Sequence, residues 1–134
     1  MIDYFIVFFY LMMAHAITDF GLQTVALGKG KYPLVPRKCL TDCERYQHKA
    51  GRLYGLHWPI WLIMHALICA AGVIVVGEFF HQKMNMVVPF LALVEFVLHF
   101  VIDYLKTIGK YGANSDQYFH MLCRVAYAII IVRA

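Results

Sequence analysis

The chain has 134 residues, of which 62% are hydrophobic and 15% are charged, and its formal net charge is +4. Soluble domains are about 45–50% apolar and about 25% charged, so the composition excludes an ordinary soluble domain. The length allows a single domain. The apolar residues lie in long blocks, which indicates membrane-spanning helices.

Four apolar segments predict a single all-α membrane domain over residues 1–134. The transmembrane helices are expected at about 2–22, 57–77, 86–106 and 116–133, because a span needs about 20 mostly apolar residues. The fourth reaches a full span only if Asp116 and the C-terminus lie in the interfaces. The first lacks the basic start and the cleavage site of a signal peptide, so we expect a retained helix. Short connections predict an up-down four-helix bundle.

Basic residues gather in the long loop between the first two predicted helices, and they predict the orientation of the chain. Positively charged loops stay in the cytoplasm, so we expect this loop inside and both termini outside the cytoplasm. Membrane lipids with anionic headgroups are the expected partner of the loop, and no nucleic acid is expected. The basic residues are Lys29, Lys31, Arg37, Lys38, Arg45, Lys49 and Arg52.

The cysteines give little indication of function. Cys69 and Cys123 lie within predicted helices, where we expect them to pack as small apolar groups. Cys39 and Cys43 precede His48 in the basic loop, a spacing that resembles a zinc site. Two thiols among lysines and arginines form a poor ligand set, so a zinc site in the loop is not favoured.

Three predicted helices carry a histidine and an aspartate four residues apart, which places both side chains on one helix face. Because the fourth helix runs opposite to the first and third, its reversed order places every aspartate toward the cytoplasm and every histidine about 6 Å deeper. The second helix adds His57 and His65, and the sequence leaves open which of them joins the site. Still deeper, Glu95 and Arg124 are expected to form a buried ion pair. The three pairs are His15 and Asp19, His99 and Asp103, and Asp116 and His120.

Three interpretations of these polar layers are open. They could form a hydrogen-bonded belt that fixes helix register, a proton or ion pathway, or a metal site. A pathway would need polar groups up to the outer face, where the helices become apolar instead. Several imidazoles beside carboxylates favour a metal, with zinc ahead of iron or manganese, and two metals are feasible. The candidate ligands are His15, Asp19, His57, His65, His99, Asp103, Asp116 and His120.

The residues around the pairs form a combined motif. It comprises Ala14-His15, Asp19-Phe20 and Leu22-Gln23-Thr24, then His99-Phe100, Ile102-Asp103 and Lys106, then Asp116-Gln117 and His120. This motif resembles the bacterial and phage membrane family called domain of unknown function 3307, which implies a place in the bacterial inner membrane but no activity. A more distant likeness to membrane-bound metal-dependent hydrolases implies an enzyme by analogy alone.

We therefore expect a metal-dependent hydrolase that acts at the inner leaflet on a lipid or a phosphate-containing substrate. The metal would lower the pKa of a bound water toward about 7. The catalytic candidates are Asp19, Asp103 and Asp116, one of which would take the proton or orient a coordinating histidine. The alternative is a non-enzymatic subunit or effector that binds another membrane protein, with homo-oligomers also possible. Lys106 is expected to extend to the interface, and Gln117 to hydrogen-bond a ligand carboxylate.

Overall fold

The computed structural model describes residues 3–22, 58–80 and 86–134, and these residues form helices with no strand among them. Their order is α1 (Tyr4–Ala16), η1 (Ile17–Gly21), α4 (Trp58–Phe80), α5 (Val87–Thr107) and α6 (Ala113–Arg133). The predicted all-α class is therefore confirmed for the described residues. The long basic loop, Cys39, Cys43 and His57 lie outside them.

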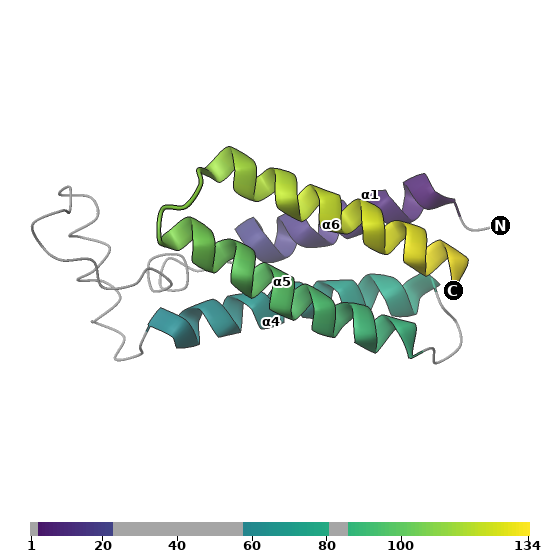
Figure 1. The fold of residues 1–134 in the computed structure, drawn as a ribbon. Helices are drawn as coiled ribbons and strands as arrows, with labels where there is room; N and C mark the ends of the chain where they lie inside the picture. The colour runs from purple at the N-terminus through teal and green to yellow at the C-terminus, as the bar shows by residue number, and fades with distance from the viewer. Residues whose placement is uncertain (1–2, 23–57, 81–85) are drawn as a thin grey trace, which may run out of the picture.

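The helices lie side by side with alternating direction, so the start of α1 and the end of α6 share one end of the bundle (Figure 1). Contacts join α1 to α4, α4 to α5, α5 to α6 and α6 back to α1. Helices that follow one another among the described elements are thus neighbours in space. This ring brings all the polar helix faces toward a shared interior.

Among the described helices, three are long and apolar enough to cross a membrane, namely α1 continued by η1, α4 and α5. α6 matches α5 at 21 residues, but its polar side chains reduce its apolar content. The bundle exposes large apolar side chains and buries polar ones, which reverses the pattern of soluble proteins and suits lipid. The exposed side chains include Phe5, Phe9, Leu67, Val75, Phe79, Phe90, Leu93 and Val97.

The apolar core fills the half of the bundle near the chain termini, and the polar residues described below fill the other half. Each helix contributes to this core at its end nearest the termini, which anchors that end by burial of apolar surface. The core consists of Val7, Leu11, Val73, Val76, Leu91, Tyr127, Ala128 and Ile131.

Close packing of α4 against α5 depends on Gly77, because a Cβ at this position would lie 2.6 Å from Val88 Cγ1. We expect Gly77→Ala to lower the free energy of unfolding by about 1–3 kcal/mol through overpacking. Thermal unfolding of the protein in mild detergent measures this loss. Gly112→Ala is the matched control, since a Cβ there meets nothing within 4 Å. Equal losses in the two variants would contradict the packing explanation.

A Schellman motif ends α5 and turns the chain into α6. The Gly109 N–H donates to the Lys106 carbonyl at 2.9 Å, and the Lys110 N–H donates to the Leu105 carbonyl at 3.0 Å. Gly109 has a φ of 76°, which glycine adopts without steric cost. This turn brings the polar start of α6 beside the polar end of α5.

Candidate metal centre

The first helix reaches the polar half of the bundle through the π-helical turn η1. The Leu22 N–H donates to the Ile17 carbonyl, five residues earlier, at 2.7 Å. Such turns recur at functional sites, because the extra residue changes the direction of the side chains that follow. Here the turn carries Asp19, whose carboxylate lies 2.9 Å from a ring nitrogen of His65 on α4.

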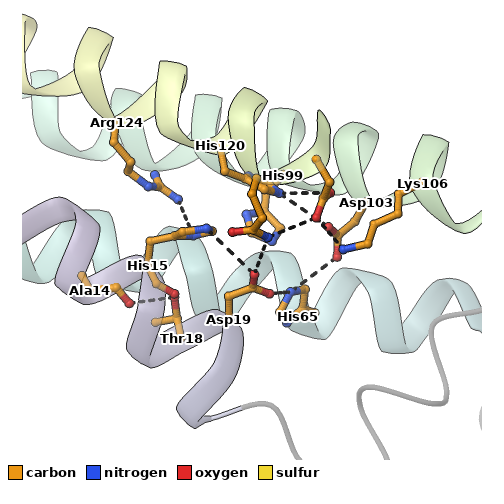
Figure 2. A network of polar contacts seen from close by, with 12 residues as sticks. Ala14, His15, Thr18, Asp19, His65, His99, Asp103, Lys106, His120 and Arg124 are labelled. Atoms are coloured by element: carbon orange, nitrogen blue, oxygen red, sulfur yellow. Dashed lines mark hydrogen bonds and ion pairs between the residues drawn. The ribbon is translucent and has the colours of Figure 1, made fainter. Parts of the chain in front are cut away.

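The three predicted His/Asp pairs meet inside the bundle together with His65, as Figure 2 shows for most of them. We call these residues the polar cluster, and every member is buried. Of the two second-helix histidines left open by the sequence, His65 belongs to the cluster, whereas His57 lies outside the described residues. The cluster consists of His15, Asp19, His65, His99, Asp103, Asp116 and His120.

Two histidines each lie between two carboxylates. His65 Nε2 lies 2.9 Å from Asp19 Oδ1 and 3.4 Å from Asp103 Oδ2. His120 Nε2 lies 3.6 Å from Asp103 Oδ1 and also 3.6 Å from Asp116 Oδ1. Donors that bind one metal at about 2.0–2.2 Å lie about 2.8–3.6 Å apart in octahedral or tetrahedral geometry. The measured spacings fall in this range.

His99 is held by a carboxylate in the orientation typical of a metal ligand. Its Nδ1 lies 3.0 Å from Glu95 Oε1. Because an ionised carboxylate only accepts hydrogen bonds, Nδ1 carries the proton, and Nε2 of the neutral ring keeps its lone pair. This Nε2 is buried and makes no hydrogen bond within the described part of the chain. Metal-bound histidines are commonly fixed by a carboxylate in this way.

His15 has the opposite arrangement. Arg124 Nη2 lies 3.2 Å from His15 Nδ1. A guanidinium only donates, so Nδ1 accepts and Nε2 of the neutral ring carries the proton. That Nε2 lies 3.9 Å from Asp19 Oδ2. In this arrangement His15 directs its Nε2–H toward Asp19 and offers no lone pair to a metal.

The predicted Glu95–Arg124 ion pair is confirmed, with Arg124 Nη2 at 2.5 Å from Glu95 Oε1 and both side chains 1% exposed. The guanidinium also lies 5.6 Å from the centre of the Tyr127 ring, within the range of a cation–π contact. Glu95 thus links α5 to α6 while it orients His99. The ion pair and the polar cluster form one connected network.

At the end of the cluster nearest the α5–α6 turn, which we call the open end because Lys106 is partly exposed there, Lys106 and Gln117 contact the carboxylates. The Lys106 ammonium is ion-paired with Asp116, with 23% of its side chain exposed. It therefore does not simply extend to the interface as expected, because the α5–α6 turn brings Asp116 within its reach. Gln117 Nε2 donates to Asp116 Oδ2 at 3.2 Å and to Asp19 Oδ2 at 3.4 Å. The hydrogen bond predicted from Gln117 to a carboxylate is therefore present, and whether these carboxylates bind a metal stays a prediction.

Aromatic side chains flank this open end. The Tyr111 hydroxyl donates to the Ile102 carbonyl. Burial raises the pKa of Tyr111 to about 12, and the charges of Asp116 and Asp103 act in the same direction. Tyr111 therefore stays protonated at neutral pH. Trp58 stacks on Tyr104 with ring centres 5.7 Å apart, which joins the start of α4 to the end of α5.

Three groups of buried side chains each bring their donor atoms within 4.8 Å of one another, close enough to hold a metal ion. The contact of His15 with Arg124 disfavours the group that contains His15. One group contains Cys69, which was expected from the sequence to pack as a small apolar group. Its position four residues after His65, on the same helix face, was the signal that could have placed it at the site. The groups are His15 with His99 and His120, His65 with Cys69 and His99, and Asp103 with Asp116 and His120.

Comparisons of the chain with models of protein families, with curated proteins and with solved structures found no match. The resemblance to domain of unknown function 3307 therefore stays a prediction from its motif residues. What the described residues establish is a buried cluster of histidines and carboxylates. It lies inside an all-helical bundle in which three helices are long and apolar enough to cross a membrane.

Proposed function

We propose that the chain is a membrane metalloprotein that binds a divalent transition metal in the polar cluster. The main support is the arrangement of His99. Its Nδ1 lies 3.0 Å from Glu95 Oε1, and its buried Nε2 makes no hydrogen bond within the described residues. Imidazole and carboxylate donors together suit zinc best, with iron or manganese as alternatives.

The proposal includes α6 as a fourth membrane-spanning helix, with the basic loop in the cytoplasm and both termini outside it. Ionisable groups are tolerated in a span when they face the bundle interior and are paired. Asp116 and Arg124 meet this condition through Lys106 and Glu95 on α5. The packing of α6 against both α1 and α5 also supports a full-length span.

We further propose that the metal serves hydrolysis of a lipid or phosphate-containing substrate at the inner leaflet of a bacterial inner membrane. When bound, the metal supplies a Lewis acid and a water of lowered pKa. Asp19 would take up the proton released in the hydrolysis and return it to the leaving group, while the N–H at His15 Nε2, 3.9 Å away, would orient that carboxylate. Lys106, which is partly exposed at the open end, adds positive charge where an anionic headgroup would enter.

Metal content tests the proposal. Protein purified from membranes in mild detergent should contain about one or two transition metal ions per chain, the range expected for one- and two-metal hydrolytic sites. Elemental analysis by mass spectrometry measures this number. Chelation should then lower the melting temperature, because an ion that binds only the folded state stabilises it. A metal-free preparation whose melting temperature is unaffected by added zinc, iron or manganese would contradict the proposal.

A second function is favoured by one contact. Gln117 Nε2 on α6 donates to Asp19 Oδ2 in η1 at 3.4 Å, so a hydrogen bond joins two helices of the cluster without a metal. In that case the cluster would fix helix register, and the chain would be a non-enzymatic subunit or effector that binds another membrane protein or a second copy. Absence of metal from a stable, purified protein would support this alternative.

A further inference from the structure

Asp103 directs its two carboxylate oxygens toward different histidines. Oδ1 lies 3.6 Å from His120 Nε2 on α6, and Oδ2 lies 3.4 Å from His65 Nε2 on α4. A carboxylate between two sets of donors can bind one metal through each oxygen, as in the metal-carboxylate centres of four-helix bundles. Each oxygen of Asp103 can bind an ion only if enough further metal-binding side chains lie near it.

On the α6 side, Asp103, Asp116 and His120 form one of the groups with donor atoms within 4.8 Å; we call it the outer set. Lys106 and Gln117 contact Asp116 through Oδ2, which leaves Oδ1 toward His120 Nε2 at 3.6 Å. Both of these atoms are buried without a hydrogen bond in the described ranges. The outer set therefore offers one imidazole and two carboxylates.

On the α4 side, His65, Cys69 and His99 form a second such group; we call it the inner set. Cys69 is 2% exposed, and the lone pair of His99 Nε2 is available, as argued from its contact with Glu95. A thiolate beside two imidazoles suits zinc and other soft or borderline metals. His15 belongs to neither set, because its Nδ1 is occupied by Arg124.

We infer that the cluster holds two metal ions, one in the inner set and one in the outer set, bridged by Asp103, with Cys69 as a ligand of the inner ion. This inference rests on the proposed metal centre and gives its nuclearity and ligands. Two-metal sites with ions about 3.5–4 Å apart are typical of enzymes that cleave phosphate esters. Aminopeptidases also use two metals, but the partly exposed ammonium of Lys106 at the open end adds positive charge. The substrate class that fits best is therefore a phosphate ester.

Titration of the metal-depleted protein in detergent with Co²⁺ tests the inference, because cobalt reports thiolate ligands by a charge-transfer band in the near ultraviolet. The wild-type protein should bind two Co²⁺ per chain and show this band. Cys69→Ala should lose the band and weaken one of the two ions. Cys123→Ala is the matched control, since Cys123 on α6 belongs to none of the donor groups. His120→Ala should keep the band while losing the outer ion.

The outcomes separate the inference from the proposed function. Binding of one Co²⁺ per chain overturns the two-ion inference and leaves the metal centre standing. Two ions with a band that survives Cys69→Ala overturn the assignment of the inner ligand. No binding at all overturns the metal centre itself. Circular dichroism confirms that each variant stays helical, and the wild-type stoichiometry and spectrum are decisive even if a variant fails to fold.

Discussion

Arg124→Met should destabilise the bundle by about 3–5 kcal/mol, because it leaves Glu95 as a buried charge without its cationic partner. Glu95 is 1% exposed and lies 2.5 Å from Arg124 Nη2, so water cannot replace the lost contact. Unfolding in mixed detergent and denaturant, followed by circular dichroism, measures the loss. Arg133→Met is the matched control, since Arg133 is exposed near the end of the same helix.

The double variant Glu95→Leu/Arg124→Met separates the ion pair from the packing of its long side chains. Replacing both members of a buried pair by apolar residues is often neutral or stabilising, so the double variant should recover most of the stability that Arg124→Met loses. A double variant as unstable as the single one would show that packing, rather than an unpaired charge, explains the loss. Equal effects of Arg124→Met and Arg133→Met would contradict the buried pair itself.

His99→Ala should have the largest effect on metal binding, because it removes the imidazole whose lone pair is best prepared for a metal. Loss of a partner that only orients a ligand weakens metal affinity by about 10–100-fold. Glu95→Gln should fall in that range, since its amide can hold His99 Nδ1 only weakly, and His99→Ala should exceed it. Competition with a chromophoric zinc chelator measures both affinities.

His15→Ala is the matched control for His99→Ala, because His15 is also a buried histidine of the cluster but its Nδ1 accepts from Arg124. We expect His15→Ala to retain the metal with affinity within a few-fold of the wild type. If His15→Ala removes the metal and His99→Ala does not, the assigned proton positions are wrong. If neither changes the metal affinity, the ligands lie elsewhere.

The sequence predicted the helical class and much of the polar cluster, because helical periodicity determines which residues share a face and how deep each lies. The pairs His99–Asp103 and Asp116–His120 show this clearly: their reversed order follows from the opposite directions of α5 and α6. The expected depth of the two residues in the membrane also predicted the Glu95–Arg124 contact. A charged side chain in an apolar helix needs a partner at the same depth.

The helical periodicity of the sequence does not determine how each helix is rotated against its neighbours. Nor does it determine which polar side chains come into contact. Only the tertiary structure places His65 between two carboxylates and Cys69 beside two histidines. It also pairs Lys106 with Asp116, because a short turn brings the ends of α5 and α6 together. Which partner each side chain contacts depends on small differences in how the helices pack. The spacing of residues along the sequence does not determine these differences.

The sequence by itself therefore determined which residues could meet inside the bundle: apolar blocks set the helices, and the spacing of four set the faces. The tertiary structure decided which nitrogen and oxygen atoms of these residues are available for chemistry. Glu95 holds Nδ1 of His99 and leaves its Nε2 available, whereas Arg124 contacts Nδ1 of His15. The two oxygens of Asp103 face His65 and His120. Proton positions depend on hydrogen-bond partners, and in this chain those partners come from different helices.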